Sequence, residues 1–280
     1  MLTSLAAPII FAFSAAFAWG SGDFVSGLGA RRIGAFHTLL LSLPIGALPA
    51  LAGAYLTGEP LSSSADLIWG VVGGMVGTVG FMAMLHGFAV GRMGVVSPVS
   101  GAIGAVVPVL ITAISEGMPG RQQLLGFALA LVSIWLLSPR GGETKQNSGL
   151  GLGVIAGLGF GLFFTTLDQI SETATFWPLA ASRLASTLLL AGIALATRRP
   201  LLPGKLPVAI LIGSGVLDML GNFLFLRAVQ YGRLDIAAVL ISLGPGITVL
   251  LARLIEKEHL SRLQVAGVGL ALVAIALITV

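Results

Sequence analysis

The sequence predicts an all-α membrane protein with ten transmembrane helices, arranged as two inverted five-helix repeats. Of its 280 residues, 56% are hydrophobic and only 9% are charged. Soluble domains average about 25% charged residues, so most of this surface must face lipid rather than water. Two further observations support the prediction: apolar stretches of membrane-spanning length recur along the chain, and the two halves of the sequence resemble each other.

Ten segments are long and apolar enough to cross a bilayer, which takes about 20 mainly apolar residues per helix. Backbone polar groups in lipid must pair within their own segment, and the alternation typical of barrel strands is not seen, so we expect helices. The segments are residues 5–28, 34–57, 67–90, 94–115, 122–139, 149–170, 177–197, 206–229, 234–255 and 263–280.

The polar stretch 139–148 lies near the middle of the chain and is the longest between two apolar segments. We therefore expect a first five-span repeat over 1–139, a linker over 140–148 and a second five-span repeat over 149–280. The other connections are short and predict no soluble domain. We expect no signal-peptide cleavage after 16–18, because no positive charge precedes the apolar run and the run continues past it.

The two halves match at one constant offset, which we call the repeat register: Gly80 corresponds to Gly221, and Gly126 corresponds to Gly267. Each repeat has five spans, an odd number, so the second repeat must enter the membrane from the opposite side. Inverted repeats of this kind are typical of secondary transporters, which place a binding site near the bilayer midplane between the two repeats.

Composition excludes several classes of function. The chain has no cysteine, so it holds no disulfide and no thiolate metal site. Its Lys and Arg residues are scattered singly or in pairs, which predicts no nucleic-acid partner despite the net charge of +4. His37, His86 and His259 lie far apart and no paired-acid motif accompanies them, so we expect neither an enzyme nor a metal site nor a cofactor.

Four stretches resemble one family: AFAWGSGDF (16–24), residues 87–110, residues 227–254 and EHLSRLQVAG (258–267). Over nearly its whole length the chain is similar to the drug/metabolite transporter superfamily, in the ten-helix branch made of two EamA-type domains. The last stretch matches the signature Glu-x-Leu-Ser-x-x-Gln-x-x-Gly of that family. Its first-half counterpart, EGMPGRQQLLG (116–126), keeps the Glu, Gln and Gly but has one extra residue and lacks the Ser.

The resemblance implies a multi-pass protein of a bacterial-type inner (plasma) membrane that exports a small metabolite, amino acid or amphipathic compound without ATP. It implies a small-molecule substrate and membrane lipid as partners, and a monomer or homodimer. A lipid-linked carrier flippase of the same superfamily is the main alternative, and an intramembrane enzyme is a remoter one. The motifs specify neither the substrate nor the coupling ion.

Ionisable residues inside membrane spans are costly and usually functional. Asp218 lies about halfway along its segment, with Asn222 on the same helix face, and Asp23 lies near the end of the first segment. We expect these three to bind substrate, and Asp218 and Asp23 to exchange a coupling proton. A structural hydrogen bond between helices is the alternative for Asp218, and a cap of a broken helix is the alternative for Asp23.

Arg183 matches an arginine that the family often shows, and its counterpart in the first repeat is Ser42. We expect it to bind a substrate anion, with a structural ion pair as the alternative. Ligand pockets are mostly apolar with few polar groups. We therefore expect Trp19, Met82 and Phe163 to line the substrate site, although each could instead serve packing or face lipid.

Proline removes a backbone hydrogen bond and kinks a helix. Pro98, Pro108 and Pro245 therefore predict two bent helices that act as gates. The orientation of the chain stays open. Eleven of the fifteen Lys and Arg residues lie on the side of the loops that follow the odd-numbered segments, which predicts external termini. The usual topology of the family has cytoplasmic termini.

Overall fold

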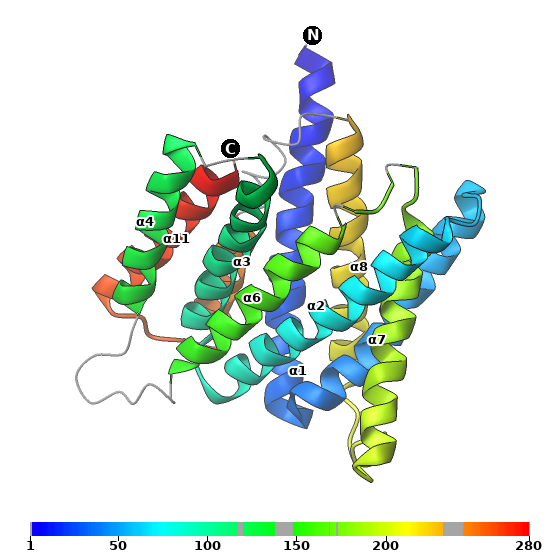
Figure 1. Ribbon diagram of the computed structural model, residues 1–280. Coiled ribbons are helices and arrows are strands. Elements are labelled where there is room, and N and C mark those ends of the chain that lie inside the picture. The colour runs from blue at the N-terminus through cyan, green and yellow to red at the C-terminus, as the bar shows by residue number, and fades with distance from the viewer. Residues whose placement is uncertain are drawn as a thin grey trace.

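The computed structural model describes residues 2–116, 120–137, 148–167, 169–171, 173–231 and 243–279 (Figure 1). These residues form helices and connecting loops and contain no strand, as predicted. The helices are α1 (Leu2–Thr57), α2 (Ser64–Val90), α3 (Met93–Glu116), α4 (Arg121–Leu137), α6 (Leu150–Leu167), α7 (Phe176–Ala196), α8 (Val208–Tyr231), α10 (Gly244–Ile255) and α11 (Arg262–Thr279).

Four helices of the described chain are long and apolar enough to cross a membrane. They are α2, α7, the part of α1 from Ile10 to Thr57, and the part of α8 from Val208 to Phe225. The remaining helices are apolar but shorter. The all-helical membrane fold is therefore confirmed, whereas the count of ten spans stays a prediction. Most of the predicted linker 140–148, and the start of segment 234–255, lie outside the described residues.

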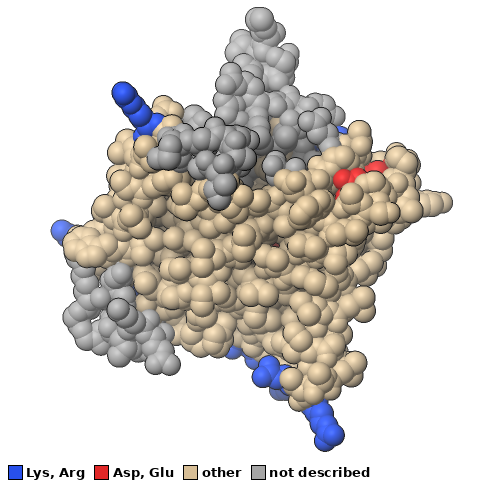
Figure 2. Space-filling model, viewed as in Figure 1, with Lys and Arg blue, Asp and Glu red and all other residues tan. Residues whose placement is uncertain are grey.

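The outer surface of the bundle is apolar. Leu131, Trp135 and Leu188 are 64–71% exposed, a position that would be unfavourable for such side chains in water. Figure 2 shows a broad band without Lys, Arg, Asp or Glu across one face, with the charged residues at its borders. This distribution fits a bundle whose middle lies in hydrocarbon and whose two ends reach the polar interfaces.

Helix α1 contains two of the predicted segments, which meet at Gly34. This residue has φ 82° and ψ 153°, a backbone conformation essentially restricted to glycine. The gap between the predicted segments 5–28 and 34–57 is helical as far as this residue. Helix α1 changes direction sharply at the bottom of the view in Figure 1. A single glycine thus turns the chain back toward the face from which it came.

Replacing Gly34 with alanine is expected to lower the free energy of unfolding by about 1–3 kcal/mol. An added Cβ would meet nothing within 4 Å, so the whole penalty would come from the backbone conformation. Thermal unfolding in detergent would measure it. Gly192→Ala is the matched control, because Gly192 is helical and equally open; alanine there should raise stability slightly. Equal effects of the two substitutions would contradict the explanation.

Helices α4 and α11 pack against each other through reciprocal contacts. Gly126 of α4 lies against Ala274 of α11, and Gly267 of α11 lies against Ser133 of α4. The repeat register relates Gly126 to Gly267 and Ser133 to Ala274, so it converts the first pair into the second. Along α4 the contact residues run from 126 to 133, whereas their partners on α11 run from 274 to 267. The two helices are therefore antiparallel.

The same relation connects two larger helix pairs, α1 with α8 and α6 with α2. Gly22 of α1 lies against Leu217 of α8. Their counterparts in the repeat register are Phe163 on α6 and Val76 on α2, and Phe163 lies against Gly77, the neighbour of Val76. The contact of α1 with α8 therefore has an equivalent in the contact of α6 with α2, in which the two halves of the chain have changed roles.

Candidate binding site between α1, α7 and α8

An ion pair joins two helices inside the bundle. The Nη2 atom of Arg183 on α7 lies 2.6 Å from Oδ2 of Asp218 on α8, and the two side chains are only 12% and 23% exposed. Asp218 lies near the middle of its helix, as predicted. A largely buried charge is stable only when it is paired, so each side chain holds the other in place.

The guanidinium group of Arg183 keeps spare hydrogen-bonding capacity. Its Nε atom is buried and has no hydrogen-bond partner among the described residues. A guanidinium carries five N–H donors in a rigid fork, and buried donors without acceptors are unfavourable. The ion pair with Asp218 therefore leaves a donor that a ligand oxygen or a water molecule can satisfy.

Asp23 of α1 lies beside this pair. Its neighbour Gly22 is at a close approach of α1 and α8, since a Cβ on Gly22 would lie 3.4 Å from the backbone nitrogen of Asp218. Asp23 is half-buried, and its carboxylate interacts electrostatically with that of Asp218. Three of the ionisable residues singled out in the sequence thus come together from three helices and both halves of the chain.

Further polar side chains extend this cluster along α1 and α8. Ser26 and Ser214 form a buried hydrogen bond of 2.6 Å between the two helices. They lie about one helical turn from Asp23 and Asp218, a spacing that places them on the same helix faces. Neither serine was predicted from the sequence, although this spacing was the signal that could have identified both.

Asn222 and Trp19 lie next to the cluster but have structural contacts. The Nδ2 atom of Asn222 donates to the backbone oxygen of Asp218 at 2.7 Å, a bond within α8. The indole of Trp19 lies against Gly221, and its ring centroid is 5.6 Å from that of Phe225. A role of either residue in binding stays a prediction.

Met82 on α2 and Phe163 on α6 have other contacts in the structure. Phe163 lies against Gly73 and Gly77, and Met82 packs at the edge of the largest hydrophobic cluster. Neither contact places these side chains beside Arg183. The structure thus brings Asp23, Arg183 and Asp218 together, whereas a role of Met82 or Phe163 in binding stays a prediction.

The charges of this cluster are not repeated at the equivalent positions of the other half. In the repeat register Asp23 corresponds to Phe164, Asp218 corresponds to Gly77, and Arg183 corresponds to Ser42. The duplicated scaffold therefore carries these charges at one of its two equivalent interfaces only.

The three prolines occupy two kinds of position. Pro98 and Pro108 lie inside α3, as predicted. Pro245 lies in the first turn of α10, where a missing N–H costs nothing because it would have no partner within the helix. It therefore starts the described part of α10 rather than kinking it, and the gating role of all three stays a prediction.

The motif EHLSRLQVAG has a structural explanation at each of its signature positions. Ser261 and Gln264 form a reciprocal capping box at the start of α11: the Gln264 N–H donates to Ser261 Oγ at 3.2 Å, and the Ser261 N–H donates to Gln264 Oε1 at 3.0 Å. Leu260 lies against Gly94 of α3, and Gly267 admits α4.

Glu258, the first residue of the motif, caps a helix of the other half. Its carboxylate accepts backbone N–H groups of Met93 at 3.1 Å and of Gly94 at 3.0 Å, at the start of α3. It also pairs with Arg31 of α1 at 2.8 Å, and Arg31 pairs with Glu256 at 2.6 Å. The motif therefore ties α1, α3 and α11 together at one end of the bundle.

Replacing Ser261 with alanine is expected to cost about 1 kcal/mol of stability, since the cap of α11 loses its acceptor. The first-half counterpart, Gly120, keeps only the backbone bond to Gln123 Oε1, at 3.0 Å. Gly120→Ser should complete that capping box and raise stability by a few tenths of a kcal/mol. Thermal unfolding measures both, and changes of the same sign would contradict the assignment.

At the opposite end of the bundle a second carboxylate caps a second helix. Glu59 accepts backbone N–H groups of Thr175 and Phe176 at 2.9 and 3.0 Å, at the start of α7, and its own carbonyl accepts the indole N–H of Trp177 at 3.0 Å. Asp66 accepts the Ser171 N–H at 2.8 Å and the Ser63 hydroxyl at 2.7 Å.

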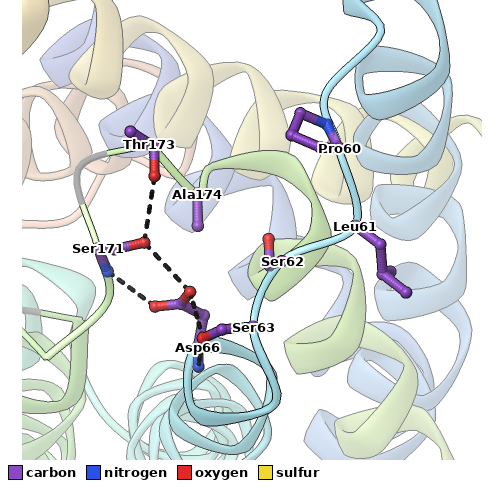
Figure 3. Close-up of a pocket in the computed structure, with 8 residues that line it drawn as sticks. All are labelled: Pro60, Leu61, Ser62, Ser63, Asp66, Ser171, Thr173 and Ala174. Carbon is purple, nitrogen blue, oxygen red and sulfur yellow. Dashed lines mark hydrogen bonds between the residues drawn. The ribbon is translucent and has the colours of Figure 1, made fainter.

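A pocket of about 330 Å³ lies between these two loops, with the Asp66 carboxylate and the hydroxyls of Ser63, Ser171 and Thr173 at its edge (Figure 3). None of its lining residues belongs to the Arg183–Asp218 cluster. Over the described ranges, no group of three or more potential metal ligands occurs.

Known proteins resemble this chain in sequence and in fold. The model of the EamA-like transporter family matches residues 6–138 and again residues 147–280. An uncharacterized protein of Methanocaldococcus jannaschii is 29% identical over 131 residues, which cover 47% of this chain and 94% of that protein. A solved crystal structure with 16% identity covers 98% of both chains at a TM-score of 0.63, so it shares the fold. Because the family matches both halves, the chain belongs to the EamA-like transporters.

Proposed function

We propose that the protein is a secondary transporter that exports a small metabolite, amino acid or amphipathic compound across a plasma membrane by alternating access. The observation that carries the proposal is the ion pair between Arg183 and Asp218, with Asp23 beside it. Charges inside membrane helices are retained where they bind a substrate or relay a proton. The cluster offers both a carboxylate pair for a proton or cation and a guanidinium for an anion.

The reciprocal helix contacts support an inverted duplication of ten spans. Gly126 with Ala274 and Gly267 with Ser133 are related by the repeat register, and the helices concerned are antiparallel. An axis that exchanges two antiparallel helices is perpendicular to both, which is the geometry of inverted repeats. The half-length of the Methanocaldococcus relative also fits a duplicated five-helix unit.

We further infer that the end of the bundle opposite the two termini faces the cytoplasm. Helix α1 begins and α11 ends in the upper part of Figure 1. The loops after the odd-numbered segments, rich in Lys and Arg, would lie at the other end, and cytoplasmic loops carry such an excess. A reporter enzyme fused to the C-terminus should be active only outside the cytoplasm; cytoplasmic activity would contradict this orientation.

A transport screen in proteoliposomes tests the proposed function directly. Amino acids and amphipathic cations would be offered with and without a pH gradient, and empty liposomes would serve as the control. The proposal predicts saturable uptake of at least one compound, and a pH gradient should change the rate if Asp218 or Asp23 carries a coupling proton. Absence of uptake in every condition, from protein that remains folded, would contradict the proposal.

A further inference from the structure

The two carboxylate caps occupy opposite ends of the same helix. Glu59 lies just before α2, which begins at Ser64, and the cap formed by Glu258 lies just after α2, at Met93 and Gly94. Helix α2 has 27 residues and is therefore about 40 Å long at 1.5 Å per residue. One cap thus lies at each end of α2. Gly74, near the middle of α2, lies against Ser182, so the neighbouring Arg183–Asp218 pair lies at a level between the two caps.

Each cap joins the two halves of the chain, but the carboxylate comes from the first half in one cap and from the second half in the other. Glu59 belongs to the first half and holds the N-terminus of α7 in the second half. Glu258 belongs to the second half and holds the N-terminus of α3 in the first half, together with Arg31 of α1. A carboxylate at a helix N-terminus satisfies N–H groups that have no partner within the helix and is favoured by the helix dipole.

Both caps are formed in this structure, and each would have to break before the two halves could separate at that face. The Glu258 side chain is only 11% exposed, so its carboxylate is largely shielded from water while the cap is formed. Breaking the Glu258 cap frees its carboxylate and the N–H groups of Met93 and Gly94. Breaking the Glu59 cap frees its carboxylate and the N–H groups of Thr175, Phe176 and Trp177. Water can solvate all of these groups once the interface opens, so each cap can break and form again reversibly.

We propose that Glu258 with Arg31 at one face, and Glu59 at the other, are the two gates of the transport cycle, and that they open alternately. The alternate opening of the two gates rests on the proposed function, whereas the positions of the two caps do not. Opening at the Glu258 face exposes the central cluster to one side of the membrane while the Glu59 cap holds the other side closed. The reverse state releases Glu59 and restores Glu258.

The absence of cysteine from the sequence allows a direct test. Ser214→Cys would place one thiol beside the central cluster, one turn from Asp218, without removing a charge. A membrane-impermeant maleimide would be applied to oriented proteoliposomes from either side. Glu258→Gln and Glu59→Gln would be compared in this background, with Thr57→Val as the control, because Thr57 lies two residues from Glu59 and its exposed hydroxyl donates to the backbone oxygen of Gly53 within its own helix.

Glu258→Gln should raise the labelling rate roughly three- to tenfold from its own face only, and Glu59→Gln should do so from the opposite face only. Thr57→Val should change neither rate. Equal acceleration from both faces, or no acceleration in either variant, would overturn the proposal; melting temperatures near that of the parent would show that the variants are folded. The labelling readout needs no transported substrate. Side-specific labelling combined with absence of uptake by the parent protein, in which Ser214 is intact, would therefore contradict the proposed function and not the two gates.

Discussion

Replacing Asp218 with asparagine is expected to abolish transport and to destabilise the protein. The substitution leaves the Arg183 guanidinium without its partner at 2.6 Å, in a position where that side chain is only 12% exposed. Removing one member of a buried ion pair costs up to about 3–5 kcal/mol, and the partial exposure of Asp218 should reduce this value. Thermal unfolding and liposome transport would measure the two effects separately.

The double variant Arg183→Gln with Asp218→Asn separates a structural pair from a functional one. It removes both charges, so most of the stability should return, because replacing a buried pair with neutral groups is often nearly neutral. Transport should remain lost if the charges bind substrate or a proton. A double variant that transports at the rate of the parent protein would reduce the ion pair to a structural contact.

Alanine at Gly74 or Gly215 is expected to disrupt the packing of the two halves. A Cβ on Gly74 would lie 2.5 Å from the backbone oxygen of Ser182, and a Cβ on Gly215 would lie 2.5 Å from the backbone oxygen of Ser42. Backbone atoms cannot move aside as a flexible side chain does. Overpacking of this kind costs about 1–3 kcal/mol, so both variants should unfold at lower temperature.

Gly74 and Gly215 correspond to each other in the repeat register, and each admits a helix of the other half at the same kind of crossing. Matched losses of stability are therefore expected from the two substitutions, with Gly192→Ala as the unhindered control. A variant at either position as stable as the control would show that the crossing is looser than described.

Composition and periodicity were sufficient to predict the helices, because lipid removes every alternative way of pairing the backbone. The polar core was predictable for a related reason: Asp23, Arg183 and Asp218 stand out in apolar segments. Whether these three residues lie close together depends on how the helices are arranged. In the sequence, only the duplication gives information on that arrangement. Met82 and Phe163 were assigned to the site by side-chain type alone, and that type does not distinguish lining a pocket from packing.

The two caps that we propose as gates were not predicted, since Glu59 and Glu258 hold the starts of α7 and α3 through backbone N–H groups. A backbone N–H group can be supplied by almost any residue type. The residue types at the starts of α3 and α7 therefore do not predict these contacts. The Ser-x-x-Gln spacing of the capping box at Ser261 was visible and has a known physical meaning. Gly34 could not be identified as a turn because the chain contains 39 glycines, most of which serve close packing.

Side-specific labelling of one repeat-related pair of loop positions tests the inverted duplication most directly. Gly58 and Arg199 correspond in the repeat register, and both lie in exposed loops that join the second and third predicted spans of their halves. Single cysteines at these positions, in a chain otherwise free of cysteine, would be probed with an impermeant maleimide. Inverted halves predict that the two sites react from opposite sides of the membrane, and reaction of both from the same side would contradict the account.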